Sequence, residues 1–435
     1  MATAASNVAP VAVAREIIDP AAYAQWDHLL GTFDWLREHM PVARIEPGRE
    51  APNLFPPFWL VTRYDDVMRV SKDNATFLNN PRTVVFNLTD GIEFARAFSG
   101  GSEHMVASLV TFDAPIHLKY RRLTQDWFMP KNLRTIEHEV RGIASAAVDR
   151  LISAGPEVDF VTAVAAPYPL HVVMRILGVP EEDEARMLTL TQQMFGGQDE
   201  DLNQSGIKNL PPEAVARIIA GAVTDFEVYF AKLTAEKRAR PTGDVASTIA
   251  NAMVDGAPLN DRDMMGYYII VAAAGHDTTS ASTAGAMLAL AQDPAQWARV
   301  KADRSLLAGI VEEAIRWTSP VQHFMRTAAH DTELGGQAIK AGDWLMINYV
   351  AANHDPAQFA DPRKFDAARS PNRHLAFGAG AHQCLGLHLA RLEMRILFEE
   401  LLDRIDAVEL AGEFARSKST FVGGLKTLPL RIRAA

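Results

Sequence analysis

A long apolar segment in the second half of this 435-residue chain constrains the fold more than any other feature. Met264–Gly275 reads MMGYYIIVAAAG, which is apolar on every face of a helix, and such a helix is buried in a protein core. Asn260, followed three residues later by Asp263, predicts the start of the helix, and Asp293-Pro294 predicts its end at about Gln292. At 1.5 Å per residue this helix would be about 45–50 Å long, enough to cross a large helical protein.

The string AGHDTT, Ala274 to Thr279, places polar residues in this apolar segment. An aspartate and two threonines in a buried helix are unfavourable unless they have partners or a function. Thr278 can donate to a carbonyl one turn earlier and loosen the helix, and Gly275 is expected to leave room for a ligand against the backbone. The string therefore predicts a small polar notch in an apolar wall. The alternative is a kink whose polar groups are satisfied internally, and His276 receives no role.

The rest of the chain predicts a mainly α-helical protein with small β-sheets. Helical patterns dominate from about residue 115 to 320, and short runs of β-forming residues occur at 58–62, near 83–86, at 344–349 and at 421–430. This order is not a βαβ alternation. We expect one domain over residues 1–435, in which residues 1–25 form a loosely held arm. The polar, turn-rich segment 198–212 is expected to be a mobile loop or a plain surface connector.

Composition excludes several classes of protein. A net charge of −10 argues against a nucleic-acid binder. A single cysteine excludes internal disulfides, cysteine zinc clusters and a fused iron–sulfur domain. The N-terminal segment has neither an apolar run of membrane length nor the pattern of a signal peptide, so a cytoplasmic location is expected.

The single cysteine, Cys384, lies in the string FGAGAHQCLG. Gly378 and Gly380 precede it, and Gly386 follows it where a helical pattern begins. Backbone N–H groups at a helix N-terminus favour a thiolate. A loop bent by glycines would let that thiolate approach a large flat ligand such as haem, whose iron accepts cysteine. Two other interpretations are a buried structural cysteine and a cysteine hydrolase whose histidine is distant in sequence.

This string resembles the haem-binding loop of the cytochrome P-450 family, F-G-x-G-x-H-x-C-x-G. The matching positions are Phe377, Gly378, Gly380, His382, Cys384 and Gly386. The resemblance covers the chain from about residue 30 to the end. It implies the family's fold, with haem b between the long central helix and the helix after the Cys loop. It also implies that Cys384 is the axial iron ligand and that Phe377, Gly378 and Gly386 contact the cofactor.

The AGHDTT string resembles the distal, oxygen-binding helix of the same family, which has the pattern (A/G)-G-x-(D/E)-T-T. The resemblance implies that Ala274 and Gly275 lie beside the cofactor. It implies that Asp277 and Thr278 are the acid–alcohol pair that delivers protons for dioxygen activation.

Four basic residues match the family positions that bind the haem propionates. They are His117, Arg121, Arg326 and His382. His117 and Arg121 are four residues apart and share one face if their segment is helical.

A further match concerns Glu313 and Arg316, which fit the family's E-x-x-R helix, and Arg369, which fits its F-D-x-x-R segment. By pattern alone, an i,i+3 pair of this kind is more often at the surface. The resemblance instead assigns the three residues to holding the loop that carries Cys384, since arginine can bind a carboxylate with two parallel hydrogen bonds.

The resemblance implies a monooxygenase that inserts one oxygen atom of O2 into a C–H bond of its substrate. The sequence has no G-x-G-x-x-G motif and no flavin or ferredoxin module. We therefore expect a monomer that receives electrons from a 2Fe–2S ferredoxin and its NAD(P)H-dependent reductase, docked beside the Cys loop near Arg373, Arg391 and Arg395. The alternatives are a peroxygenase, which lacks the acid–alcohol pair, a fatty-acid hydroxylase, and a haem sensor or carrier, which would not need that pair.

The segments expected to line a substrate pocket are largely apolar, which predicts a small hydrophobic substrate. They include Val321, Phe324, Phe421 and Val422, with Thr279, Gln322 and His323 as the polar contacts. Strings such as YPLHVVM, RWTSPVQHFMRTA and FVGG are similar to those of the terpineol-hydroxylating bacterial branch of the family. A monoterpenoid or an alkyl-substituted aromatic compound is the expected substrate.

Overall fold

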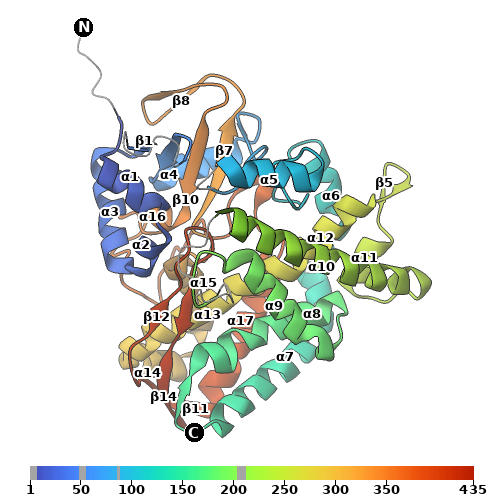
Figure 1. Cartoon of the computed structure of the whole chain (residues 1–435). Helices are drawn as coiled ribbons and strands as arrows, with labels where there is room; N and C mark the ends of the chain where they lie inside the picture. Colours follow the sequence, from blue (N-terminus) through green and yellow to red (C-terminus); the bar gives the residue numbers. More distant parts are fainter. Residues whose placement is uncertain (1–6, 49–54, 86–88, 203–211) are drawn as a thin grey trace.

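The computed structural model of the chain describes residues 7–48, 55–85, 89–202 and 212–435. A large helical body and a smaller β-rich region lie side by side, with the β-rich region at the upper left of Figure 1. The prediction of a mainly helical protein with small sheets is confirmed.

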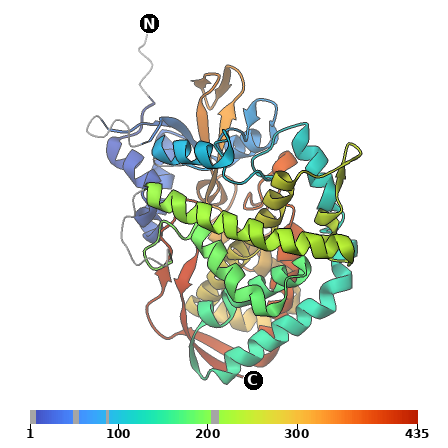
Figure 2. The ribbon, with the colours of Figure 1, turned by 45° about the vertical axis from the view of Figure 1, so that its right-hand side comes forward.

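The helical body contains the long helices of the middle and the end of the chain. These are α6 (Ile116–Gln125), α7 (Pro130–Ser153), α8 (Pro167–Leu177), α9 (Glu184–Phe195), α10 (Pro212–Ala239), α11 (Val245–Ala250), α12 (Asp261–Ala274), α13 (Asp277–Gln292), α14 (Pro294–Ala302), α15 (Leu307–Thr318) and α17 (Leu387–Arg404). A π-helical turn, η1 (Val161–Ala165), precedes α8, and short 3₁₀ turns are η2 (Glu181–Asp183), η3 (Arg304–Leu306) and η4 (Gly380–His382). Figure 2 shows α10 lying across the outer face of this body.

The β-rich region is a five-stranded sheet in the order β1-β2-β10-β7-β3. Its strands are β1 (Val42–Ile45), β2 (Phe58–Val61), β10 (Trp344–Asn348), β7 (His323–Ala328) and β3 (Phe77–Leu78). The β2–β10 pair is parallel, and the other pairs are antiparallel. The helices of this region are α1 (Val11–Ile18), α2 (Pro20–Ala24), α3 (Trp26–His39), α4 (Tyr64–Lys72), α5 (Thr89–Ser99) and α16 (Tyr349–Asn353).

Smaller ladders complete the structure. A three-stranded sheet has the order β11 (Ile405–Leu410), β14 (Pro429–Ala434) and β4 (Glu157–Asp159). The two-stranded ladders are β12 (Ala415–Arg416) with β13 (Leu425–Thr427), β5 (Met253–Val254) with β6 (Ala257–Pro258), and β8 (Thr332–Leu334) with β9 (Gln337–Ile339). The runs expected at 58–62 and 344–349 are strands, and the tail is extended from Leu425. Residues 83–85 form no strand, and Phe86 lies outside the described residues.

The prediction of a loosely held arm over residues 1–25 is wrong for the part that the structure describes. Helices α1 and α2 pack into the apolar core of the β-rich region, where Ile17 is 0% and Tyr23 is 2% exposed. The Tyr23 hydroxyl donates to the Ile17 carbonyl oxygen at 3.0 Å. Apolar residues on one face of each short helix give this segment enough buried surface to order it. Residues 1–6 lie outside the described part.

The long central helix is divided into two. Asn260 caps α12 by accepting from the Asp263 backbone N–H at 3.0 Å, as predicted. Helix α12 ends at Ala274, and α13 begins at Asp277. The Thr278 hydroxyl donates to the Ala274 carbonyl oxygen at 2.9 Å, so the predicted back-bond is present at the break. The sequence predicted a loosened continuous helix, whereas Gly275 and His276 interrupt it.

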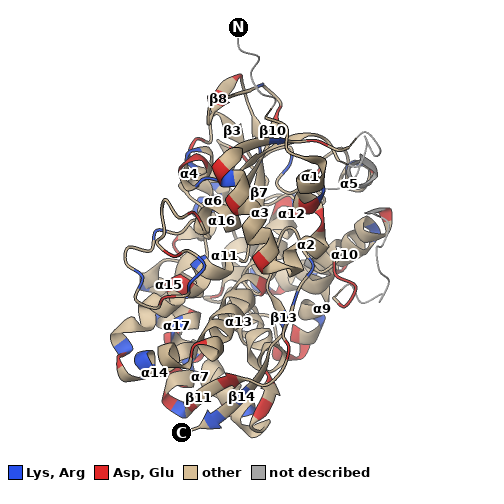
Figure 3. Cartoon of the chain, turned by 90° about the vertical axis from the view of Figure 1, so that its left-hand side faces the viewer, with Lys and Arg blue, Asp and Glu red and all other residues tan. Residues whose placement is uncertain are grey.

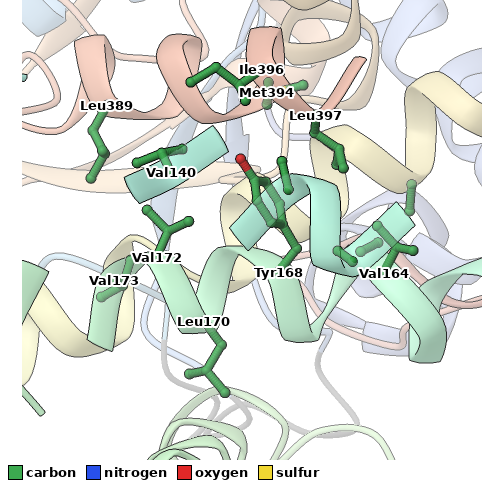
Figure 4. Packing of buried hydrophobic residues seen from close by; sticks show 14 of the residues in the cluster. Val140, Val164, Tyr168, Leu170, Val172, Val173, Leu389, Met394, Ile396 and Leu397 are labelled. Carbon is green, nitrogen blue, oxygen red and sulfur yellow. The ribbon is translucent and has the colours of Figure 1, made fainter. Parts of the chain in front are cut away.

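Helix α17 is fixed by the core of the helical body. Tyr168 of α8 is 0% exposed, and its hydroxyl donates to the Glu393 backbone carbonyl oxygen at 2.9 Å. Figure 4 shows Tyr168 pointing toward α17 among Val140 of α7 and Met394 and Ile396 of α17. The middle of α17, the helix that follows the Cys loop, is therefore held by the core of the helical body.

The segment after α9 is bonded to the C-terminal hairpin, which is formed by β12, β13 and the residues between them. Asp199 is 1% exposed and accepts from the Lys418 backbone N–H at 2.8 Å and from Lys426 Nζ at 3.1 Å. Gln198 accepts from the Thr420 backbone N–H at 3.0 Å. Residues 198–202 are thus anchored, contrary to the mobile loop expected over 198–212, and residues 203–211 lie outside the described part.

The surface carries charges of both signs. On the face shown in Figure 3, basic and acidic side chains are interspersed. Among the described residues, no helix combines the length and apolar character needed to cross a bilayer.

Candidate active site

The loop that carries Cys384 is built by glycine conformations and backbone hydrogen bonds. Gly378 and Gly380 have φ of +66° and +76°, in the left-handed region that favours glycine. A Cβ at Gly380 would lie 2.7 Å from the Ser71 carbonyl oxygen, so this position accepts no side chain. The Cys384 backbone N–H donates to the Phe377 carbonyl oxygen at 2.8 Å and closes the loop.

Two opposing influences act on the Cys384 thiol. Burial raises its pKa, and the backbone N–H of Gly386 and the guanidinium groups of Arg121 and Arg391 lower it. Burial is the larger influence, so the helix N-terminus alone does not make the thiolate the favoured form. Coordination to a metal cation deprotonates a thiol, and it would supply the missing stabilisation.

Three side chains hold the first residue of the loop, of which the sequence reasoning missed Glu312 and His374 and gave Arg391 a different role. The Arg391 guanidinium lies 4.8 Å from the centre of the Phe377 ring, and the His374 ring centre lies 5.6 Å from it. Glu312 accepts from Arg391 Nε at 2.6 Å and faces His374 Nε2 at 3.3 Å. Burial alone would raise the pKa of Glu312, but hydrogen bonds from His374 and Arg391 lower it to about 2. The one sequence feature that could have pointed to Glu312 is its position next to Glu313.

The structure brings together Glu313, Arg316 and Arg369. Glu313 and Arg316 are both 0% exposed, which contradicts the surface alternative for the pair. Glu313 accepts from Arg316 Nη2 at 2.7 Å and from Arg369 Nε at 3.0 Å. Arg316 Nη1 also donates to the Asn353 carbonyl oxygen at 2.8 Å, and Asn353 Oδ1 accepts from the Leu375 backbone N–H. The cluster is therefore connected to the chain that leads into the Cys loop.

A second cluster gathers basic side chains from three elements. His117 and Arg121 lie on α6, Arg326 on β7 and His382 in η4. The His117 and His382 rings lie 3.9 Å apart. Burial, and then Arg121, lower the pKa of His117 to about 4. Burial, and then His117 and the two arginines, lower the pKa of His382 to about 3.

This basic cluster lacks acidic partners among the described residues. Arg326 Nε is buried without a hydrogen-bond partner there, and Arg121 forms no ion pair with any described residue. The nearby Asp113 carboxylate accepts instead from the backbone N–H groups of Asn79 and Asn80. The two arginines are the cations of the cluster, with Arg326 buried and Arg121 partly buried. A cation without a counter-charge is unfavourable in such a place, so the cluster fits a ligand that carries carboxylates.

One stripe of the divided central helix is open. Ala274 is exposed and Thr278 is partly exposed, although Ala272, Ala273 and Thr279 beside them are buried. Ala274 and Thr278 are one turn apart and face the same side. Cys384, the two arginines of the basic cluster and this open face of the helix together fit a haem group.

Gly275 has a different role from the one expected. A Cβ at Gly275 would lie 2.7 Å from Val173 Cγ2 of α8. The missing side chain therefore lets α8 pack closely against the break between α12 and α13. On the side where a Cβ would lie, Gly275 therefore leaves room for α8 and not for a ligand.

The polar groups at the break lie close together. Asp277 Oδ1 lies 3.0 Å from His276 Nδ1, and the Asp277 side chain is 27% exposed. The hydroxyl of the next residue, Thr278, is held by the Ala274 carbonyl. A carboxyl group in contact with solvent thus adjoins a hydroxyl on the open stripe.

Comparison with known proteins agrees with this geometry. The family described as cytochrome P450 matches residues 119–410. Cytochrome P450-terp from Pseudomonas sp is 43% identical over 426 residues, covering 98% of this chain and 98% of that protein. The chain is a cytochrome P450. This P450 superposes on the crystal structure of CYP108D1 from Novosphingobium aromaticivorans with a TM-score of 0.91 and 63% identity, covering 98% of this chain and 100% of that one. Linalool 8-monooxygenase from Pseudomonas putida is 32% identical over 374 residues, covering 85% of this chain and 88% of that protein.

The P450 fold and the monooxygenase class follow for this chain. Proteins of this family bind haem through a cysteine thiolate, and the chain has one cysteine, so haem is its cofactor.

The residues expected to line the P450 pocket divide into two groups. Val321 and Val422 form a β-bridge, and the Phe421 ring lies 5.5 Å from the Phe324 ring. All four side chains are partly exposed. They form an apolar wall between β7 and the C-terminal hairpin.

The three polar residues expected in the pocket are committed elsewhere, which corrects the sequence prediction. Thr279 donates to Glu393 Oε1 at 3.0 Å, and Gln322 Nε2 donates to the Ser419 carbonyl oxygen at 2.8 Å. His323 Nδ1 donates to the Thr420 carbonyl oxygen at 2.8 Å. His323 Nε2 accepts from a backbone N–H, and burial lowers the pKa of His323 to about 4, which keeps it neutral. These side chains hold the wall in place.

A cavity of about 280 Å³ lies between the 105–107 segment, α10 and α12. Its lining includes Phe98, Met105, Val106, Val223 and Ile269. Arg262 and Glu227 are the charged side chains that border it.

Proposed function

We propose that this P450 hydroxylates a small hydrophobic substrate, a monoterpenoid of the terpineol type or an alkyl-substituted aromatic compound. The observation that carries the proposal is the apolar wall of Val321, Phe324, Phe421 and Val422 beside Gln322 and His323, whose side chains donate to backbone carbonyl groups of the protein. A wall made of apolar side chains favours a ligand with few polar groups. Cytochrome P450-terp and linalool 8-monooxygenase are relatives whose names point to terpenoid substrates, which supports this class.

The loop and the basic cluster would hold the cofactor. Cys384 would be the iron ligand, supported from behind by Phe377 and, through the chain, by Glu313 with its two arginines. His117, Arg121, Arg326 and His382 would bind the two propionates. When bound, haem supplies the activation of dioxygen and the oxygen transfer to the substrate.

Asp277 and Thr278 would then deliver protons. The partly exposed Asp277 carboxyl can exchange its proton with solvent. The Thr278 hydroxyl donates to a carbonyl, so its oxygen lone pairs remain available to accept from a proton donor on the open stripe. Such a pair is unnecessary for a peroxide-using enzyme, which favours the monooxygenase with O2 as substrate.

Electrons would come from a 2Fe–2S ferredoxin and its NAD(P)H-dependent reductase, and we propose a monomer docked on the face beside the Cys loop. Arg391 and Arg395 are less available than the sequence suggested, because Arg391 pairs with Glu312 and Arg395 with Glu137 and Glu399. Arg373 is exposed and has no ion pair among the described residues, so it is the better candidate of the three.

The test is an absorbance titration of the haem-loaded protein with terpenoids, alkylbenzenes and fatty acids. A low- to high-spin shift with the cyclic compounds is expected. A shift with fatty acids alone would contradict the substrate class. Addition of a ferredoxin with its reductase should then give hydroxylated product, and product formation from peroxide alone at the same rate would contradict the electron source.

A further inference from the structure

His276 is the buried residue at the break of the central helix for which the chemistry above has no use. Its side chain is 1% exposed. Nε2 lies 3.1 Å from the backbone carbonyl oxygen of Ala166, which follows η1 and precedes α8. A carbonyl oxygen can only accept, so Nε2 carries a proton. In the neutral ring, Nδ1 therefore bears a lone pair.

The contact between His276 and Asp277 requires a further proton. Nδ1 lies 3.0 Å from Asp277 Oδ1, and in the present orientation no hydrogen bond joins Nδ1 to any described atom. A lone pair of the ring and a carboxylate oxygen at this distance repel each other. A proton on either atom converts the contact into an attraction.

The titratable groups on the helices packed against the break have contacts of their own. Burial raises the pKa of Glu393 of α17 well above its ordinary value, and this carboxyl group is bonded to Thr279. His171 of α8 lies 3.1 Å from Glu184. Among the described residues, His276 and Asp277 are the two titratable groups that meet at the break. Solvent reaches this contact through the exposed part of Asp277.

We propose that His276 is a positioning residue for proton delivery, which shares one proton with Asp277 and fixes its carboxyl group beside Thr278. This inference rests on the proposed role of Asp277 and Thr278. When the Asp277 O–H bond breaks and its proton passes to the acceptor at the Thr278 side, the carboxylate remains. A proton from solvent hydronium then restores the shared O–H or N–H bond, and charge is balanced.

The test is a double-variant cycle of His276→Leu, Asp277→Asn and the combination, in the haem-loaded enzyme with its electron-transfer partners. The readouts are product formed per electron pair, peroxide released and the solvent isotope effect. Loss of a general acid lowers a rate by about 100-fold or more. His276→Leu is expected to lower coupled product formation by about 3- to 30-fold, and to have no further effect once Asp277 is Asn. His276→Gln, which can keep the donor to Ala166, should recover part of the loss.

A second readout does not depend on turnover. The infrared band of a protonated carboxyl group, taken as wild type minus Asp277→Asn, should shift or weaken in His276→Leu. The substrate-induced spin shift should be unchanged in Asp277→Asn and in His276→Leu. His354→Leu is the matched control, because His354 is a 1% exposed histidine bonded to the Val350 carbonyl oxygen and has no carboxylate contact among the described residues.

The outcomes separate the two proposals. If Asp277→Asn remains fully coupled, the delivery role of Asp277 is wrong, and the role of His276 falls with it. If Asp277→Asn uncouples the enzyme but His276→Leu does not, the inference about His276 alone is overturned. If His276→Leu lowers product formation by the same factor in the wild type and in Asp277→Asn, His276 is a structural residue and the inference is overturned. The same holds if His354→Leu loses as much coupling as His276→Leu.

Discussion

Replacement of Glu313 by Gln tests how the buried ionic cluster supports the Cys loop. Glu313 is 0% exposed and accepts from Arg316 and Arg369, from the Asp366 backbone N–H at 3.0 Å and from Asn372 Nδ2 at 3.0 Å. Gln has nearly the same shape but leaves two buried guanidinium groups without a counter-charge. Removing one partner of a buried pair costs about 3–5 kcal/mol. The free energy of unfolding of native proteins is about 5–15 kcal/mol, so this loss is a large share of it.

Urea unfolding followed by circular dichroism and by the haem absorbance band would measure the effect. Because Arg316 and Asn353 connect Glu313 to the chain entering the loop, the haem band of Glu313→Gln should be lost at lower urea than the helical signal. In the wild type the two transitions should lie closer together.

The matched control is Glu213→Gln on α10. Glu213 pairs with Arg217 through the same chemistry, but their side chains are 58% and 68% exposed. An exposed helical pair contributes about 0.3–0.5 kcal/mol. Equal losses of stability in the two variants, or a loss below about 1 kcal/mol for Glu313→Gln, would refute the argument from burial.

Three further predictions concern the break and the loop. Thr278→Ala should keep the spin shift but lower product per electron pair by about tenfold or more, with peroxide as the other product, and a fully coupled variant would contradict this. Gly275→Ala should destabilise the protein by about 1–3 kcal/mol because its Cβ meets Val173, and adding Val173→Ala should restore part of the thermal midpoint; an unchanged midpoint in the single variant would speak against the packing role. The pKa of Glu312 is lowered from 4.5 to about 2, so its contribution to stability is present above about pH 4.5 and is lost as the pH falls toward 2. Unfolding free energies measured across this window should fall less steeply in Glu312→Gln, and identical slopes would contradict the assignment.

Local sequence patterns predicted those features that depend on one segment. The Cys loop needs glycines at two positive φ positions, and the cap at Asn260 needs one side chain and one backbone N–H. The Thr278 back-bond likewise joins residues one turn apart. Each could be predicted because both partners lie within a few residues.

Features that depend on distant partners were missed. Nothing near Gly275 in the sequence reveals that Val173 fills its open side. The same holds for His323, whose two partners lie 97 and 238 residues away, so that a histidine expected to face substrate is part of the framework. Pattern alone placed Glu313 and Arg316 at the surface, and only the packing of the helix that carries them shows that they are buried.

The apolar wall of Val321, Phe324, Phe421 and Val422 is held in place through backbone atoms, so its support does not depend on the size of its own side chains. Gln322 and His323 donate to the backbone carbonyl oxygens of residues 419 and 420, and every type of residue has such a carbonyl. Val321, Phe324, Phe421 and Val422 can therefore change size without breaking a hydrogen bond of the framework. Each methylene gained or lost there moves discrimination between substrates by about 1–3 kcal/mol. If the wall lines the proposed pocket, substrate preference can change by small steps in side-chain volume there, while the residues of the Cys loop and of the helix break stay the same.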